Sequence, residues 1–222
     1  MNATLVQAGS TLEHQAVAQT WQGEPLSTYV CRLDALAQRL PRMERRPFEV
    51  RPSESRRISA PWLPGLPPQV ENPYYDLVVR VPDQQIRSEV PVGLVSKRYR
   101  LVQHHELVEG VVNGLKAVKL SWDSLRTDVR ITEFGSRLHV TVHLPERFRA
   151  AVGHDELDLT IERLNSVDRS WAFRVGMGWI RLVCGNGLFV GRVTATMRRA
   201  HVESLRVGHV PGLIARGSRQ RK

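Results

Sequence analysis

The side chains best suited to chemistry in this sequence are basic ones that lie beside an aromatic ring. The segment K-R-Y-R places Lys97, Arg98 and Arg100 around Tyr99, between an expected strand and an expected helix. A basic turn followed by a helix N-terminus offers positive charge and backbone N–H groups to a phosphate. Rings such as those of Tyr99 and Trp122 can stack on nucleic-acid bases. This segment therefore predicts a contact with an anionic partner.

Further arginines lie within strand-like and terminal segments. Arg130, Arg174 and Arg181 fall in the middle of alternating runs. Burying an arginine there costs free energy unless its side chain reaches water or pairs with an acid. If they share the polar face of one sheet, they form a cationic groove for nucleic acid. The full set of predicted nucleic-acid-binding residues is Lys97, Arg98, Tyr99, Arg100, Arg130, Arg174, Arg181, Arg192, Arg198 and Arg199.

Nearby acids give the basic positions an alternative interpretation. If Glu133, Asp158 and Glu162 pair with the arginines across the strands, the same residues form only a structural sheet surface. The choice depends on the strand register, because a shift by one residue moves every side chain to the other face. The sequence leaves both interpretations open.

Carboxylates could also hold a metal ion for catalysis. Asp155, Asp158, Glu162 or Asp168 could supply a Mg²⁺ site in a nuclease. No catalytic lysine motif accompanies them, and no nucleophile elbow, Walker loop or dinucleotide-binding glycine pattern occurs. We therefore predict no catalytic residue, no metal and no cofactor, while a Mg²⁺-dependent nuclease stays open as the enzyme alternative.

Two pairs of histidines do not have the spacing of a metal site. His104 and His105 are adjacent, so on a helix they point about 100° apart. His139 and His143 share a strand face but lie roughly 13 Å apart at normal strand rise. Both pairs are expected to be structural.

The charge balance favours an anionic partner. The chain has 222 residues, with 32 Lys and Arg against 22 Asp and Glu, a net charge of +10. Such an excess is more typical of proteins that bind nucleic acid than of proteins that bind membranes. Cys31 and Cys184 have no companion at metal spacing and make no disulfide framework. No signal peptide or membrane-length apolar run occurs, so we expect a cytoplasmic protein without a membrane partner.

Composition divides the chain into three expected parts. Residues 1–73 are expected to form a helical and proline-rich arm with a linker, residues 74–207 an α+β core domain, and residues 208–222 a basic flexible tail. Within the arm, helical spacing predicts helices near 12–20 and over 27–40. An arginine run follows, which is either a solvated surface or a phosphate-contacting arm.

The expected core alternates strands with one clear helix. Strands are predicted over 75–81, 90–96, 117–122, 129–134, 137–144 and 157–165, and a helix over 102–115. One side of each strand is apolar and the other is polar, as when helices cover a single face. The predicted fold class is α+β: a mostly antiparallel meander sheet with helices packed on one face, an extended N-terminal arm and a basic C-terminal tail.

The segment 165–191 is the most strongly patterned part of the chain. Alternating runs at 171–177 and 180–184 predict a hairpin whose joint is flanked by Gly176 and Gly178, where a tight hairpin, a bulge or a close backbone approach would favour a residue without a Cβ. After Gly187 the residue spacing is compatible with a helix.

Three ordered motifs carry a family resemblance. They are G-L-V-S-K-R-Y-R-L-V-Q at 93–103, L-N-S-V-D-R-S-W-A-F-R-V-G at 164–176 and W-I-R-L-V-C-G-N-G-L at 179–188. The chain resembles the phage/plasmid-like protein family, domain of unknown function 932, over about residues 74–199. The matching positions are Val95, Ser96, Tyr99, Val102, Gln103, Asn165, Ser166, Asp168, Ser170, Arg181, Val183, Cys184 and Asn186. Arg169 departs from the family, which tends to have glycine there.

The resemblance implies a mobile-element origin rather than a particular reaction. The layout of a helix and an antiparallel sheet is similar to that of single-strand annealing recombination proteins, which would place Arg174, Arg181 and residues 97–100 along a DNA groove on an oligomer.

The leading hypothesis is a non-enzymatic phage or plasmid protein that binds and anneals single-stranded DNA in recombination, as a homo-oligomer. The alternatives are the Mg²⁺-dependent nuclease and an anti-defence factor that binds a host protein complex.

Overall fold

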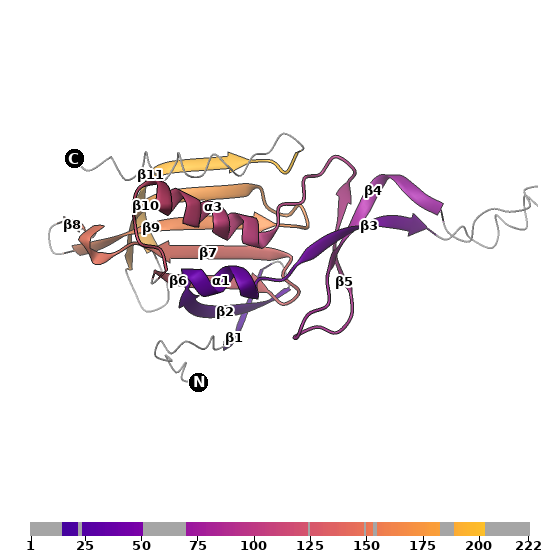
Figure 1. Ribbon diagram of the computed structural model, residues 1–222, viewed down its shortest axis with the longest axis horizontal. Helices are drawn as coiled ribbons and strands as arrows, with labels where there is room; N and C mark the ends of the chain where they lie inside the picture. The colour runs from indigo at the N-terminus through magenta and orange to yellow at the C-terminus, as the bar shows by residue number, and fades with distance from the viewer. Residues whose placement is uncertain are drawn as a thin grey trace, which may run out of the picture.

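Two antiparallel sheets and a few helices make up the part of the chain that is described in the computed structural model (Figure 1), namely residues 15–21, 24–50, 70–123, 125–148, 150–152, 155–182 and 189–202. The helical elements are α1 (Leu33–Leu36), η1 (Ala37–Arg39), α3 (His104–Ala117) and η2 (Glu146–Phe148). The mostly antiparallel, sheet-dominated fold that the sequence predicts is confirmed.

The larger sheet has the strand order β1-β2-β6-β7-β9-β10-β11, and β8 pairs with β9. Its strands are β1 (Gln15–Trp21), β2 (Glu24–Arg32), β6 (Arg126–Thr132), β7 (Arg137–His143), β8 (Ala150–Val152), β9 (Asp155–Ser166), β10 (Phe173–Leu182) and β11 (Phe189–Arg199). The smaller sheet has the order β3-β4-β5, with β3 (Met43–Val50), β4 (Val70–Arg80) and β5 (Val90–Ser96). Strands β2 and β3 both precede residue 74 and pair with later strands, β6 and β4 respectively.

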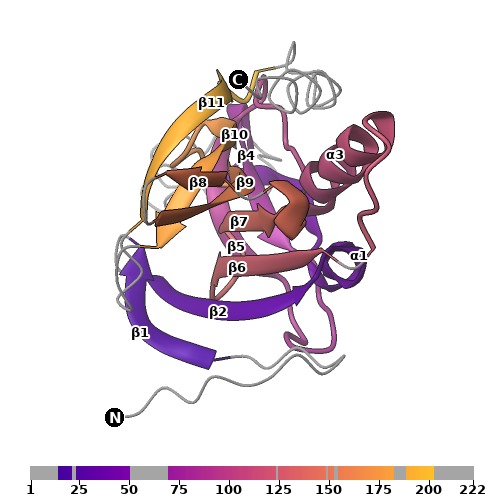
Figure 2. The same cartoon turned by 90° about the vertical axis from the view of Figure 1, so that its left-hand side faces the viewer.

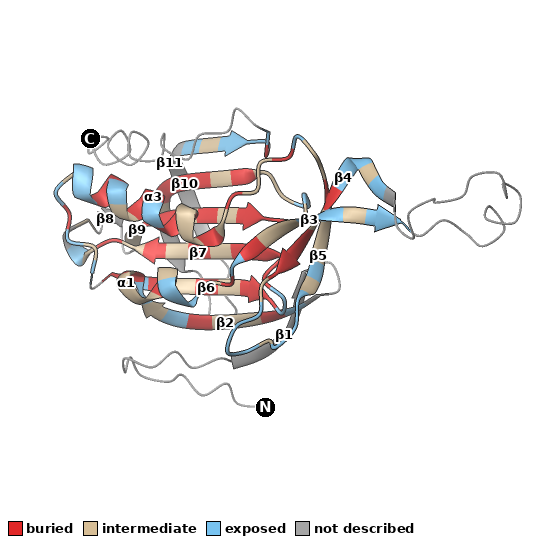
Figure 3. Ribbon diagram, turned by 45° about the vertical axis from the view of Figure 1, so that its right-hand side comes forward, coloured by how far each residue is buried: buried red, intermediate tan, exposed pale blue. Residues whose placement is uncertain are grey.

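Strand alternation gives the larger sheet one apolar and one polar face. On β7 the side chains of Leu138, Val140 and Val142 are buried, while those between them are half-buried. The apolar face shares one core with the buried side of α3, and Figure 2 shows α1 and α3 on the same side of the sheet. Burying each Leu, Val or Phe side chain contributes about 1.5–3 kcal/mol. Figure 3 shows this burial in red along the central strands.

A second, smaller core joins the two sheets. It contains Met43, Val78 and Val95 from β3, β4 and β5, Tyr99 from the turn after β5, and Val167, which directly follows β9 of the larger sheet. The start of α3 is fixed to this region, because the Gln103 side chain donates to the Met43 carbonyl at 2.8 Å and accepts from the Met43 N–H at 3.1 Å. The two sheets are therefore held together near the N-terminus of α3.

The N-terminal helices that the sequence predicts are wrong. Residues 15–21 form β1, and residues 24–32 form β2, which pairs on one side with β1 and on the other with β6. Only 33–39 are helical. Thr28, Tyr29 and Val30 favour strand, and hydrogen bonding to two neighbouring strands outweighs the helical spacing of the leucines that follow.

The predicted hairpin within 171–184 is also wrong. Residues 173–182 form one continuous strand, β10, and the glycines coincide instead with a register shift between Met177 and Gly178 in its pairing with β11. The helix predicted after Gly187 is strand β11, and the strand predicted over 117–122 is the end of α3 and a turn. The other predicted strands and the helix over 102–115 are confirmed, with small shifts at their ends.

Candidate nucleic-acid interface

Three arginines of the larger sheet stand in one line across its strands. Backbone pairing places Arg130 opposite His139, His139 opposite Leu164, Leu164 opposite Arg174, and Arg174 opposite Arg198. Directly paired residues point to the same side of a sheet, and this side is the polar one. We call Arg130, Arg174 and Arg198 the arginine row. It crosses from β6 to β11, roughly 19 Å at the usual strand spacing.

The arginine row carries charge that the described residues do not neutralise. Arg198 is exposed, Arg130 and Arg174 are half-buried, and none of the three forms an ion pair with a residue in the described ranges. Arg174 and Arg198 are direct cross-strand partners, and like charges in that position destabilise a sheet. An anion bound between them would remove this repulsion.

One carboxylate lies next to the row. Glu162 accepts a hydrogen bond from His139 at 3.0 Å, which lowers the pKa of Glu162, and the charges of Arg174 and Arg130 lower this pKa further. Two arginines of the row thus share one carboxylate that is already bonded to a histidine. The arrangement gives this part of the sheet a net positive charge.

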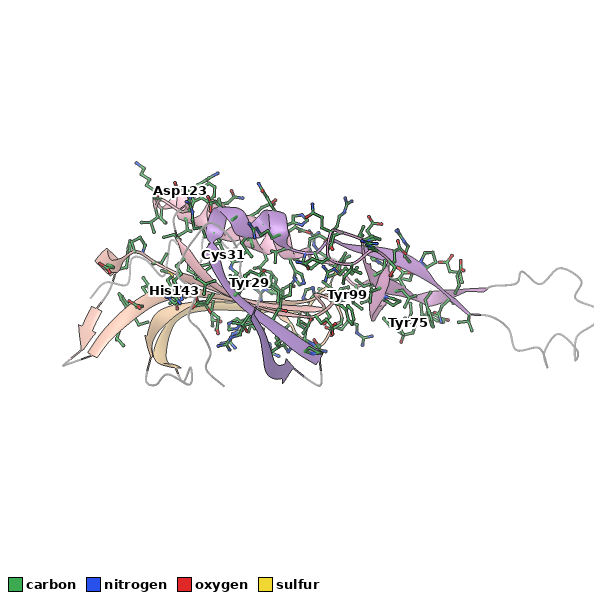
Figure 4. The ribbon with its side chains drawn as sticks, turned by 90° about the horizontal axis from the view of Figure 1, so that it is seen from below. Tyr29, Cys31, Tyr75, Tyr99, Asp123 and His143 are labelled. Carbon is green, nitrogen blue, oxygen red and sulfur yellow. The ribbon has the colours of Figure 1, made fainter. Side chains whose placement is uncertain are left out.

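A second group on the same sheet is balanced. Burial opposes ionisation of Asp128, but hydrogen bonds from His143 at 2.7 Å and Arg126 at 3.1 Å lower its pKa below the usual range. Figure 4 labels His143. Around Asp128 the charges of the described residues are therefore balanced, unlike those of the arginine row.

The basic segment 97–100 is largely neutralised. Lys97 forms ion pairs with Asp76 at 2.8 Å and with Glu71, and both hydrogen bonds raise the pKa of Lys97. Arg100 lies 3.5 Å from Glu106. Arg98 alone is exposed without an ion pair to a described residue. Lys97 and Arg100 are therefore paired with acids, as in the alternative interpretation of the sequence. Arg98 stays a candidate contact for nucleic acid.

Tyr99 lies at the junction of the two sheets (Figure 4) and is buried. Its hydroxyl donates to the Ser166 carbonyl at 2.9 Å, and its ring stacks on His201 with centroids 5.0 Å apart. Tyr99 is therefore wrong as a base-stacking residue. Trp122 is half-buried, with the Lys116 ammonium over its ring at 5.0 Å.

Arg174 and Arg181, which the sequence predicts to lie along one groove, are far apart in the sheet. Both residues lie on β10, roughly 23 Å apart along the strand. The side chains of Arg181 and Arg192 lie outside the described residues. Arg199 is exposed at the end of β11, opposite Phe173.

The arginine run before residue 51 is also paired. Arg45 binds Asp76, and Arg46 lies 2.7 Å from both Glu44 and Glu89. The described part of this run is thus a paired surface rather than a phosphate-contacting arm.

Two of the four carboxylates proposed for a nuclease, Glu162 and Asp168, are engaged elsewhere. Asp168 forms an ion pair with Arg137 at 2.8 Å, in which both side chains are almost fully buried. Glu162 is bonded to His139, as described above, and the side chain of Asp155 lies outside the described residues. Within the described ranges, no group of three metal-ligating side chains occurs.

Two residues of the family motifs, Val102 and Asn165, meet in one buried network. Asn165 Nδ2 donates to the Val102 carbonyl at 3.0 Å and lies 3.1 Å from His104 Nδ1, while His104 Nε2 lies 2.7 Å from the Gly135 carbonyl. Burial lowers the pKa of His104 to about 4, so the ring is neutral at pH 7. This network therefore fixes the start of α3 to the larger sheet.

Two basic residues were not singled out as sites by the sequence. Arg163 is fully buried on the apolar face, where Nη1 donates to the Leu107 carbonyl at 3.2 Å and burial lowers its pKa to about 9. Arg169 is exposed with a φ of 70°, the left-handed region. The strand alternation of 157–165 places Arg163 on the apolar side, and the departure from the family glycine marks Arg169.

Comparison with known proteins identified one family. The model of the family described as "Domain of unknown function (DUF932)" matches residues 91–209, more than half of the chain. No curated protein and no solved structure matched. Among the described residues, no helix is long and apolar enough to cross a membrane.

Proposed function

The chain belongs to the DUF932 family, and we propose that it is a phage or plasmid protein that binds single-stranded nucleic acid, with single-stranded DNA favoured, on the polar face of its larger sheet. Its role would be binding and annealing during recombination, as a cytoplasmic homo-oligomer.

The arginine row is the observation that supports this function most. Its three arginines lie on one side of the sheet, on β6, β10 and β11, and two of them are direct cross-strand partners. Arginine binds phosphate oxygens through its planar fork of N–H donors. A row of phosphates supplies the negative charge that this face lacks.

The arrangement of the layers also supports the proposal. The helices α1 and α3 lie on one side of the sheet (Figure 2), and the arginine row lies on the other side. A positively charged sheet surface that follows a backbone is typical of sequence-independent single-strand binding. The net charge of +10 adds long-range attraction for a polyanion.

Electrophoretic mobility shifts with single-stranded DNA, duplex DNA and single-stranded RNA test the proposal. We expect a shift with single-stranded DNA at low salt and a much weaker shift with Arg130→Gln/Arg174→Gln/Arg198→Gln. An absence of any shift for the wild-type protein at about 50 mM salt would contradict the proposed function.

The same samples distinguish the two alternatives. Labelled DNA that is cleaved with Mg²⁺ and left intact with EDTA would support the nuclease. A host protein captured from nuclease-treated lysate, together with no nucleic-acid shift, would support the interaction factor.

A further inference from the structure

Arg169 occupies a backbone conformation that is unfavourable for its side chain. Its φ of 70° lies in the left-handed region, where a Cβ crowds the backbone. Among the described non-glycine residues, only Lys119, with a φ of 55°, shares a positive φ. Strained residues of this kind persist only where the surrounding structure fixes them.

The turn that contains Arg169 is fixed on both sides. Asp168 accepts hydrogen bonds from the Ser170 N–H at 2.9 Å and from the Ser170 hydroxyl at 2.6 Å, and it is bound by Arg137. On β5, Gly93 allows the turn to approach, since a Cβ there would lie only 2.8 Å from the Asp168 Cα. These contacts impose the left-handed conformation on residue 169, whichever side chain it carries.

The turn lies at the junction of the two sheets and next to β10. The backbone of Arg169 lies against the buried Tyr99 hydroxyl. The same turn leads directly into β10, on which Arg174 of the arginine row is the second residue. Arg169 therefore lies beyond the start of β10, five residues before Arg174, and outside the line of the arginine row.

The charge of Arg169 is available to a ligand. Its side chain is exposed and forms no ion pair with a described residue, because the adjacent Asp168 is bound to Arg137. The local fold gains nothing evident from an arginine here, whereas glycine would adopt this φ without strain.

We infer that Arg169 is a phosphate contact for single-stranded nucleic acid, in the turn before β10 and in addition to the arginine row. This inference rests on the proposed function. It assigns to residue 169 a binding role that opposes its effect on stability: the arginine weakens the fold and strengthens binding.

Two glycine substitutions test the inference, because each removes one positive charge and relieves one left-handed residue. Arg169→Gly should raise the melting temperature by about 3 °C and weaken binding to an oligo-dT by about fivefold at about 0.1 M salt, the effect of one phosphate contact. The matched control is Lys119→Gly, at the exposed turn that ends α3. It should raise the melting temperature similarly and leave the affinity unchanged. Arg169→Lys should retain most of the affinity.

The outcomes separate this inference from the proposed function. Wild-type binding with no loss in Arg169→Gly overturns the role of Arg169 and leaves the proposed function in place. An equal loss in Lys119→Gly shows that only total charge matters and overturns it as well. A lower melting temperature for Arg169→Gly contradicts the conformational reasoning. No binding by the wild-type protein overturns both proposals.

Discussion

The salt dependence of binding measures how many phosphates the arginine row contacts. Each contact with a single strand contributes about 0.7 to the slope of log affinity against log salt, so three arginines account for about 2.1. Between about 50 and 200 mM salt, a slope of 2.1 corresponds to about 18-fold in affinity. Arg130→Gln/Arg174→Gln/Arg198→Gln should lose this part of the salt dependence.

The matched control removes the same charge away from the row. Arg32→Gln/Arg42→Gln/Arg46→Gln replaces three arginines that already pair with acids, Arg32 with Asp34 at 2.9 Å and the other two with Glu44. Because these arginines are neutralised locally, the slope should change little.

Fluorescence anisotropy with a labelled oligo-dT, titrated at four or more salt concentrations, gives the slopes for the wild type and both variants. Circular dichroism of each variant checks that the fold is kept. An equal change of slope in the two triple variants would refute the reasoning, since affinity would then follow net charge and not position.

The remaining predictions concern stability. Burial lowers the pKa of His104 from 6.5 to about 4, so the unfolded chain binds the extra proton in this window. Stability conferred by the neutral ring should be present above pH 6.5 and decrease by roughly 3 kcal/mol as the pH falls to 4; urea unfolding at several pH values should show a smaller decrease for His104→Gln. Arg163→Met removes a buried, incompletely bonded guanidinium and should raise the free energy of unfolding by about 1–4 kcal/mol, whereas a lower value in urea titration would mean that Arg163 is needed for the fold. Gly93→Ala places a Cβ 2.8 Å from the Asp168 Cα and should lower the free energy of unfolding by about 1–3 kcal/mol, and an unchanged melting temperature would contradict the close approach.

The sequence predicts the central strands and α3 well because their pattern and their environment agree. In β7, Leu138, Val140 and Val142 alternate with polar residues, and the sheet buries the apolar side as expected. The helix that begins at His104 likewise has an apolar stripe and a polar N-terminus. Where local preference and tertiary packing agree, the pattern is sufficient.

The sequence fails where pairing with distant strands decides the structure. The segment that forms β2 has helical spacing, yet hydrogen bonds to β1 and β6 make it a strand. Gly176 and Gly178 predict a turn, but β10 continues through them because β9 and β11 lie on both sides. Such partners are remote in the chain, and no local pattern reveals them.

For the basic residues too, the sequence predicts the candidates but not how distant strands bring them together. Arg130, Arg174 and Arg198 were among the predicted residues, but only the register shows that they form one line. Lys97 and Arg100 were predicted alongside them, and their pairing with Asp76, Glu71 and Glu106 could not be foreseen from chain order.

Protection of arginines from chemical modification tests the central claim most directly. The protein is treated with phenylglyoxal with and without saturating oligo-dT, and the modified positions are quantified by mass spectrometry. The account predicts that Arg130, Arg174 and Arg198 are protected by the oligonucleotide, while Arg32 and Arg42 react equally in both samples. Equal modification of the arginine row with and without bound oligonucleotide would contradict it.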